Sequence, residues 1–251
     1  MPTALVTGAS SGIGVEFCRQ LATRGYEIVL VARRAERLEQ VASELPGDPV
    51  VVPHDLANDA AALPAELERR GIEVELLVNN AGFGNHGRFW ELDPAREAEQ
   101  VRLNCEAVVV LTGALLPKMV ERRSGGVIVV ASTAGMQPLP YQATYAATKA
   151  FALNFTDALN IELRGTGVKA MSVNPGPVPT EWQSVAGWEG GEDKVPGKIE
   201  ASQVVSESLD AYDAGKRAVV PGGVIRWVMR ASALAPRAVK MRVTERSYRP
   251  D

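Results

Sequence analysis

Cysteine and histidine are scarce in this chain, with two of each among 251 residues. Cys18 and Cys105 lie far apart, and neither belongs to a Cys-x-x-Cys pair or a Cys/His cluster. Disulfide scaffolds and structural zinc sites both depend on such spacings. We therefore expect no disulfide framework and no metal site, and we interpret both cysteines as small core residues in a reducing cytoplasm.

Long apolar runs, a leader sequence and excess positive charge are also missing. No apolar run approaches the ~20 residues of a membrane span. Met1-Pro2 leads directly into a predicted strand, so we expect no secretory signal. The formal net charge of −3 argues against a general nucleic-acid binder. These absences predict a cytoplasmic protein without nucleic-acid or membrane partners.

The chain does contain a regular alternation of short apolar runs and helical patterns. With 46% hydrophobic residues, its length suffices for one large α/β domain over residues 1–251. The runs lack polar alternation, as expected of strands buried on both faces of a parallel sheet. They predict strands at Thr3–Thr7, Glu27–Ala32, Val50–Pro53, 75–78, 127–131, 168–173 and 218–220.

A glycine-rich turn follows the first predicted strand and precedes a helical pattern. It reads Gly8-Ala-Ser-Ser-Gly12-Ile-Gly14. Glycines at these positions allow a tight turn and close approach of the backbone to a ligand, and the helix N-terminus then faces phosphate. A simple tight turn is the alternative, but the position after the first strand favours a nucleotide phosphate.

The next two strand ends carry residues suited to the rest of a nucleotide. Arg33 and Arg34 follow the second strand, where an acidic residue selects NAD and a basic one accommodates the 2′-phosphate of NADP. Two surface arginines are the alternative. Asp55 and Leu56 follow the third strand, where they suit an adenine amino group and ring. Asp55 is equally well explained as a helix N-cap.

Four polar residues have catalytic potential. Ser132 follows the fifth apolar run, and Tyr145 and Lys149 share one face of a predicted helix at residues 144–163. A cation near tyrosine stabilises its phenolate, although a solvated helix face would show the same pair. Asn104 interrupts the apolar stripe of a predicted helix at residues 95–120. A satisfied core amide is the alternative there.

In their order and spacing, these residues resemble the motifs of the short-chain dehydrogenase/reductase family. The resemblance covers residues 3–180 and implies a doubly wound (Rossmann), mostly parallel seven-stranded sheet with helices on both faces and the cofactor at the carboxyl edge. The matching motifs are Thr7-Gly8-x-x-x-Gly12-x-Gly14, Asn79-Asn80-Ala81-Gly82, Asn104, Ser132, Tyr145-x-x-x-Lys149 and Pro175-Gly176.

The resemblance also implies a role for each matching residue. Tyr145 becomes the acid–base residue, Ser132 holds the substrate oxygen, Lys149 lowers the tyrosine pKa and holds nicotinamide ribose, and Asn104 maintains a water-linked proton path. Ser11 departs from the basic residue of many NADP-using relatives, so NADP preference rests on Arg33, with Arg34 second. The implied cofactor contacts are Gly8, Ser10, Ser11, Gly12, Ile13, Gly14, Arg33, Arg34, Asp55, Leu56, Asn80, Ala81, Gly82, Tyr145, Lys149, Pro175, Gly176, Val178 and Thr180.

The function implied is that of an NADP(H)-dependent oxidoreductase acting on a carbonyl or secondary alcohol. The pocket candidates are mostly apolar, which favours a ketone, aldehyde or acyl chain; they are residues 83–86 and 136–141, Trp182 and Trp188. We expect residues 181–200 to form a substrate lid, His86 to be an exposed loop residue, and a homodimer or homotetramer paired through the two long helices. An NAD-dependent alcohol dehydrogenase and a non-catalytic NADP-binding regulator are the alternatives.

The C-terminal region, residues 224–251, lies outside these motifs. Residues 216–251 carry 9 basic and 2 acidic side chains, against 18 and 28 in residues 1–215. Pro236 separates two predicted helices. The first of these helices has an apolar face with arginines beside it, which suits an anionic membrane surface. We expect instead that this face packs over the pocket mouth or a neighbouring subunit. That face consists of Val224, Trp227, Val228, Ala231, Leu234 and Ala235.

Overall fold

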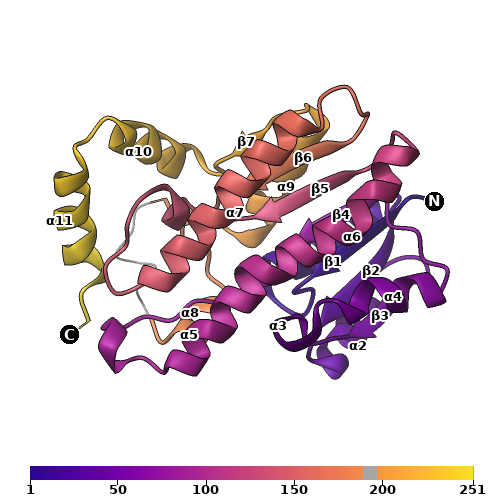
Figure 1. The fold of residues 1–251 in the computed structure, drawn as a ribbon, viewed down its shortest axis with the longest axis horizontal. Helices are drawn as coiled ribbons and strands as arrows, with labels where there is room; N and C mark the ends of the chain where they lie inside the picture. The colour runs from indigo at the N-terminus through magenta and orange to yellow at the C-terminus, as the bar shows by residue number, and fades with distance from the viewer. Residues whose placement is uncertain (189–196, 251) are drawn as a thin grey trace.

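The central element is a sheet of seven parallel strands in the order β3-β2-β1-β4-β5-β6-β7 (Figure 1). The computed structural model describes residues 1–188 and 197–250. The predicted fold is confirmed, and the sheet is parallel throughout these residues. The strands are β1 (Thr3–Thr7), β2 (Glu27–Ala32), β3 (Val50–Pro53), β4 (Leu76–Asn79), β5 (Gly126–Val130), β6 (Lys169–Val173) and β7 (Ala218–Val219).

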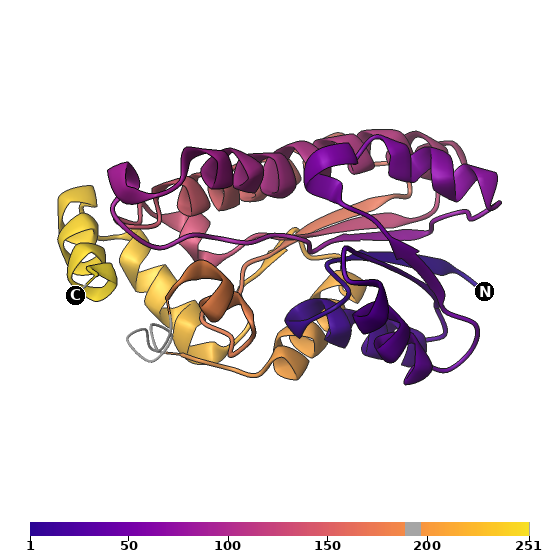
Figure 2. The ribbon, with the colours of Figure 1, turned by 90° about the horizontal axis from the view of Figure 1, so that it is seen from below.

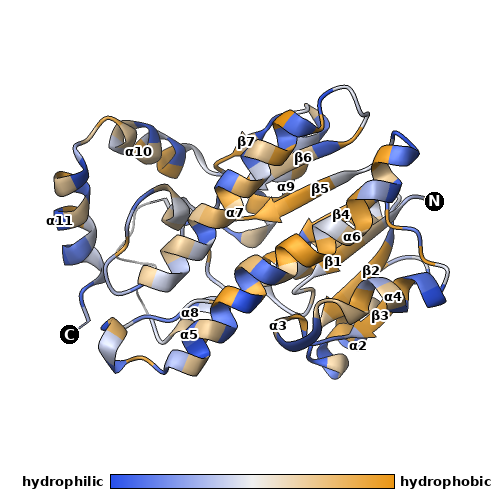
Figure 3. Ribbon diagram, viewed as in Figure 1, coloured by the Kyte–Doolittle hydropathy of each residue, from blue (hydrophilic) through white to orange (hydrophobic). Residues whose placement is uncertain are grey.

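Helices cover both faces of the sheet, as the view in Figure 2 shows. Alternate strand residues point to opposite faces, so Val6 joins one core cluster and Leu5 the other. The apolar colour of the strands in Figure 3 reflects burial on both sides. One face carries α1 (Gly12–Thr23), α2 (Ala35–Ser43) and α9 (Ala201–Asp213), and the other carries α4 (Ala62–Arg69), α6 (Ala107–Glu121) and α7 (Ala143–Glu162).

The helix expected at residues 95–120 is divided in the structure. It consists of α5 (Pro94–Val101), a π-helical turn at Arg102–Glu106 and α6. Such turns insert one extra residue and often mark functional positions. The hydrophobic period of the sequence gave no signal for it, because the helix axis continues through the turn.

The combined helix Pro94–Glu121 has 28 residues, and an 18-residue window within it has a mean hydropathy of 1.5, so it is long and apolar enough to cross a membrane by length and composition. The expectation concerned uninterrupted apolar runs, and Glu106 and Lys118 interrupt this one. One such helix is weak evidence for a membrane, since core helices share these properties. Its inner side is in the core, where Leu111 and Met119 are buried.

The C-terminal region forms two helices, α10 (Gly223–Ala233) and α11 (Arg237–Tyr248), as predicted around Pro236. The expectation that its apolar face packs over the pocket mouth is wrong, because Tyr248 alone of residues 224–250 lines the cleft; packing against a neighbouring subunit stays a prediction. Trp227 is 71% exposed and Leu234 is 89% exposed. The helix is held instead by Ile225, which is buried on its opposite side.

The remaining short elements lie mostly at the carboxyl edge of the sheet. They are α3 (Leu56–Asp59), the 3-10 turns η1 (Phe89–Glu91) and η3 (Thr133–Met136), and α8 (Trp182–Ala186). The predicted lid at residues 181–200 thus begins with a helix, and its residues 189–196 lie outside the described chain. Cys18 is buried as expected, whereas Cys105 is only half-buried.

Candidate active site

A cleft of about 400 Å³ opens along the carboxyl edge of the sheet. The chain runs from β1 outwards to β3 on one side and from β4 to β7 on the other, so the loops after β1 and β4 diverge. A crevice is expected at such a switch point. The cleft brings together every predicted catalytic and cofactor-binding residue except Gly14 and Asn104. Of the predicted substrate-pocket residues, Phe83, Trp182 and Trp188 line it, whereas residues 84–86 and 136–141 do not.

The glycine turn packs too closely for side chains. A Cβ atom on Gly14 would lie 2.2 Å from the carbonyl oxygen of Gly8, and one on Gly8 would lie 2.8 Å from Asn80 Nδ2. Gly8 and Gly12 also have positive φ angles of 67° and 54°, which favour glycine. Ser11 makes no side-chain cap at the start of α1, so the first backbone N–H groups of this helix face the cleft.

The loops after β1 and β4 are tied together by Thr7 and Asn80. The Thr7 hydroxyl accepts from the backbone N–H groups of Asn80 and Ala81, each at 2.9 Å, and donates to the Val78 carbonyl at 3.2 Å. Asn80 Nδ2 donates to the Thr7 carbonyl at 2.9 Å. The Asn80 side-chain amide thus ties the ends of β1 and β4 together. Asn80 therefore shapes the cleft wall as well as lining it.

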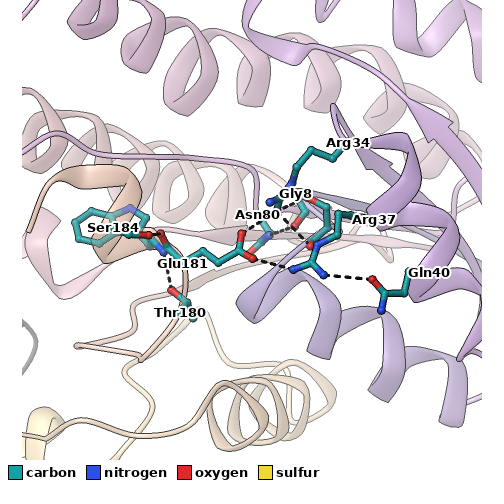
Figure 4. Close-up of polar contacts among 10 residues, drawn as sticks. Gly8, Arg34, Arg37, Gln40, Asn80, Thr180, Glu181 and Ser184 are labelled. Carbon is teal, nitrogen blue, oxygen red and sulfur yellow. Dashed lines mark hydrogen bonds and ion pairs between the residues drawn. The ribbon is translucent and has the colours of Figure 1, made fainter. Parts of the chain in front are cut away.

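At the end of the cleft where the adenosine is expected, Figure 4 shows Arg34 and Arg37 beside Glu181. Arg33, Arg34 and Glu181 line this end. Arg34 donates to Ser10 Oγ at 3.2 Å and pairs with Glu181 at 2.9 Å, while Arg37 pairs with the other Glu181 oxygen at 3.0 Å. Hydrogen bonds from Arg34 and Arg37 lower the pKa of the Glu181 carboxyl. Arg33 reaches Glu99 at 3.3 Å. Sequence reasoning missed Arg37 and Glu181, which are separated by 144 positions.

Asp55 is the N-cap of α3. Its carboxylate accepts from the backbone N–H of Ala57 at 3.1 Å and from Asn58 Nδ2 at 2.8 Å. The capping interpretation is thus confirmed. Asp55 and Leu56 also line the cleft, so contact with an adenine ring stays a prediction.

Ser132 and Tyr145 meet at the centre of the cleft. Ser132 follows β5 and caps η3, where its Oγ accepts from the N–H of Ala134 at 3.1 Å. Burial raises the pKa of Tyr145 above its ordinary value, and a hydrogen bond with Ser132 partly offsets the shift. The two hydroxyls therefore face the same part of the cleft. The expected lowering of this pKa by Lys149 is not found in the structure.

Lys149 is 7% exposed and lies one helical turn from Tyr145, as its spacing predicts. Its Nζ donates to the carbonyl oxygen of Val130 at 2.7 Å and lies 5.8 Å from the centre of the Tyr145 ring. Burial lowers the pKa of Lys149 from 10.5 to about 8. The cation is thus held beside the tyrosine by the end of β5.

Asn104 is fully paired within the π-helical turn. Its Nδ2 donates to the Phe83 carbonyl at 2.9 Å and to Thr148 Oγ1 at 3.0 Å, and its Oδ1 accepts from the Phe83 N–H at 3.2 Å. These bonds fix the loop after β4 to α7. The alternative of a satisfied buried amide is confirmed. Its implied part in a proton path stays a prediction.

Aromatic side chains form the wall opposite Ser132. The Trp182 ring centre lies 4.9 Å from that of Tyr145, and the Trp188 ring stacks on Tyr248 of α11 at 4.7 Å. His86 is half-buried and its Nε2 lies 2.7 Å from the Tyr248 carbonyl, so its interpretation as an exposed loop residue is wrong. No local signal identified Tyr248, which reaches the cleft from the end of the chain.

Gln142 is a further polar residue that sequence reasoning missed. It lines the cleft and is 2% exposed. Its Nε2 has no hydrogen-bond partner among the residues that the structure describes. A buried amide in this state is suited to an acceptor on a bound molecule.

Comparison with known proteins adds independent information. The chain matches the short chain dehydrogenase family over residues 2–188. It is 37% identical over 188 residues to a short chain dehydrogenase of Pseudocercospora fijiensis, covering 71% of this chain and 60% of that protein. It is 35% identical over 190 residues to the NADP-dependent 3-hydroxy acid dehydrogenase YdfG of Salmonella typhi, covering 72% and 75%. A structure of a short-chain dehydrogenase from Sphingobium yanoikuyae in complex with NADPH superposes with a TM-score of 0.83, 31% identity and 93% coverage of each chain.

The buried Lys149 makes stability depend on pH. Between pH 8 and pH 10.5 the unfolded chain binds more protons at this residue than the folded chain, because its pKa is lowered on folding. The free energy of unfolding should therefore rise with pH across this window, by up to about 1.4 kcal/mol per pH unit. Denaturant unfolding of the wild type and Lys149→Met, measured as a pH series, isolates this contribution. A difference between the two proteins that stays flat or falls above pH 8 would contradict it.

Proposed function

The chain belongs to the short-chain dehydrogenase family, and on this premise we propose that it is an NADP(H)-dependent oxidoreductase acting on a carbonyl or secondary alcohol. The nicotinamide cofactor supplies or accepts the hydride. The observation that carries the proposal is the meeting of Ser132, Tyr145 and Lys149 in one cleft. The names of two similar proteins, one NADP-dependent and one in complex with NADPH, support the choice of cofactor.

The residues at the adenosine end fit a dinucleotide with a 2′-phosphate. The close contact between Gly14 and Gly8 leaves backbone N–H groups, without side chains, at the start of α1. That arrangement suits a pyrophosphate. Arg33 and Arg34 line the same end of the cleft and supply positive charge for a third phosphate.

Proton transfer is assigned to Tyr145. When hydride reaches a carbonyl carbon, the oxygen gains negative charge, and a hydroxyl within reach stabilises it by donating a proton. The raised pKa of Tyr145 keeps the phenol protonated at neutral pH, which favours reduction. Ser132 holds the same oxygen. The Lys149 ammonium stabilises the phenolate that remains.

The substrate proposed is an apolar ketone, aldehyde or acyl chain. Trp182, Trp188 and Tyr248 form the wall of this end of the cleft. Among the described lining residues, the only Lys or Arg beside this wall is Lys149, since the other two, Arg33 and Arg34, follow β2 at the opposite end. A substrate carboxylate, as in the 3-hydroxy acids named for the Salmonella typhi relative, would have little to pair with here.

Pairing of subunits and a cytoplasmic location remain proposals. Three apolar side chains on the outer faces of α6 and α7 are exposed, namely Val109, Phe151 and Ile161. Exposed apolar surface of this kind suits a subunit interface. This supports the expected homodimer or homotetramer paired through the two long helices.

Catalysis is tested with NADPH and a panel of apolar ketones, aldehydes and 3-hydroxy acids. Turnover should be found with an apolar carbonyl compound. Tyr145→Phe should lower kcat by about 10²- to 10⁴-fold, because it removes only the proton donor. NADPH binding, followed by its fluorescence, should survive. Tyr141→Phe is the matched control and should retain activity. Activity near the wild-type level in Tyr145→Phe would overturn the assignment, and NADPH binding without turnover on any panel member would favour a regulator.

Cofactor choice is tested by the ratio of kcat/KM for NADPH and NADH. Arg33→Ala and Arg34→Ala should each lower the value for NADPH by roughly ten- to hundred-fold and leave NADH nearly unchanged, because each loses one charge-assisted contact. Glu181→Gln should raise the value for NADPH, since the carboxylate competes with phosphate for Arg34 and Arg37. Arg69→Ala, which breaks an exposed pair with Glu66 elsewhere, is the control. Equal use of both cofactors by the wild type would refute the choice of NADP.

Substrate fit is tested at Tyr248. Tyr248→Ala should raise KM for bulky apolar substrates about tenfold, because a ring that stacks on Trp188 is lost from the pocket wall. Tyr248→Phe keeps the ring and should behave like the wild type. Small carbonyl substrates should show little change in either variant. A KM for bulky substrates that is unaffected by Tyr248→Ala would place the substrate elsewhere.

A further inference from the structure

The outward side of α10 and α11 exposes apolar side chains. Val224, Trp227 and Leu234 are 60%, 71% and 89% exposed, and on α11 Val239 and Val243 are 49% and 60% exposed. We call these five residues the C-terminal apolar surface. A soluble monomer rarely exposes a tryptophan and several aliphatic side chains on two successive helices. Some partner is therefore expected to cover them.

Basic residues surround this surface. Residues 223–250 carry 7 basic side chains and 1 acidic one, Glu245. Arg226 pairs with Glu207 and Arg249 pairs with Glu245. Five other basic residues have no ion pair within residues 1–188 and 197–250; they are Arg230, Arg237, Lys240, Arg242 and Arg246. In Figure 3 the two helices accordingly show polar and apolar colours side by side.

The two helices are anchored so that this surface faces outwards. Ile225 is 1% exposed and packs on Gly176, where an added Cβ would lie 2.8 Å from its Cγ1. Ser232 bonds to Gln137 at 3.3 Å, and Thr244 is buried near the Pro138 carbonyl. The sides of α10 and α11 that carry these residues thus contact the rest of the chain. The C-terminal apolar surface lies on the sides that do not.

We propose that the C-terminal apolar surface binds an anionic lipid bilayer. Tryptophan and aliphatic side chains insert at the boundary between headgroups and acyl chains, and basic residues beside them attract anionic headgroups. A symmetric contact between two copies would bring the five unpaired cations of each against those of the other, which is unfavourable. Nucleic acid would pair with the cations but would leave the apolar side chains exposed.

The location of the surface fits this partner. Tyr248 lies in the same helix as Val239 and Val243, and it forms part of the pocket wall. Figure 1 shows α10 and α11 at the end of the molecule far from the N-terminus, beyond α7. Binding through these helices would therefore hold the aromatic end of the cleft close to the lipid. The binding itself does not depend on the proposed redox chemistry.

Vesicle cosedimentation with the full chain tests the proposal. One set of vesicles is phosphatidylcholine alone, and the other is an equimolar mixture with phosphatidylglycerol. The wild type should bind the mixed vesicles in a salt-sensitive manner and bind phosphatidylcholine weakly. Trp227→Ser/Leu234→Ser should lose at least about tenfold in binding, because two inserted side chains are removed. Arg230→Gln/Arg242→Gln should lose about fivefold for each charge that lies near the lipid.

Control variants separate this surface from ordinary exposed residues. Trp90→Ser removes a tryptophan that is 79% exposed beside the Arg88–Glu91 ion pair, and Arg69→Gln/Arg88→Gln removes two paired arginines. Both controls should bind like the wild type. Activity on a water-soluble substrate should be unchanged in all variants, so a failure of the enzymatic proposal would be seen independently of vesicle binding.

Two outcomes overturn the proposal. The first is wild-type binding that is absent, or equal for the two kinds of vesicle. The second is a Trp227→Ser/Leu234→Ser variant that binds vesicles normally. Light scattering also measures whether this variant forms a smaller oligomer than the wild type. If it does, and the wild type does not bind vesicles, the C-terminal apolar surface is an interface between copies of the chain.

Discussion

The buried ammonium group of Lys149 is the constraint around which the site is arranged. A charge with 7% exposure is unfavourable unless polar groups surround it. The Val130 carbonyl at the end of β5 accepts a hydrogen bond from Nζ at 2.7 Å, and the Tyr145 ring centre lies 5.8 Å from Nζ. Gly82 leaves room beside the ammonium group, since a Cβ at this position would lie 2.9 Å from Asn104 Oδ1 and 3.4 Å from Lys149 Nζ. The end of β5 holds the ammonium group, and the absence of a side chain at Gly82 leaves room for it and for Asn104.

The sheet and the first half of the cleft were predictable from the sequence because their signals are local. A strand buried on both faces requires an uninterrupted apolar run, so β1 appears directly as Thr3–Thr7. A turn that brings Gly14 within contact of Gly8 admits only glycine, so the spacing of glycines records the geometry. Tyr145 and Lys149 are one helical turn apart, so their meeting follows from the helix period. In each case neighbours in sequence decide the contact.

The features that were missed depend on contacts between distant segments. Glu181 meets Arg34 and Arg37 only because the end of β6 and the start of α2 reach the same edge of the sheet. The π-helical turn at Arg102–Glu106 follows from the need of Asn104 to reach the Phe83 loop, and the hydrophobic period is insensitive to it. The helix periodicity of α10 correctly identified an apolar face, but it did not show that this face is exposed to solvent. Ile225, which lies off that face, determines which side is buried.

Local sequence signals predict the end of the cleft proposed for the cofactor, whereas contacts between distant segments form the end proposed for the substrate. The residues proposed to hold the cofactor and to donate the proton lie at or before residue 181, within the part of the chain that matches the family. The aromatic wall begins with Trp182 and is completed by Tyr248, which lies beyond that match at residue 188. Hydride chemistry needs the same backbone geometry for every substrate, so its residues keep recognisable spacings. A substrate wall needs only the right shape and polarity, which segments of many sequences can provide. The family could therefore be predicted from the sequence. The aromatic wall could be identified only from the structure, in which Tyr248 of α11 stacks on Trp188.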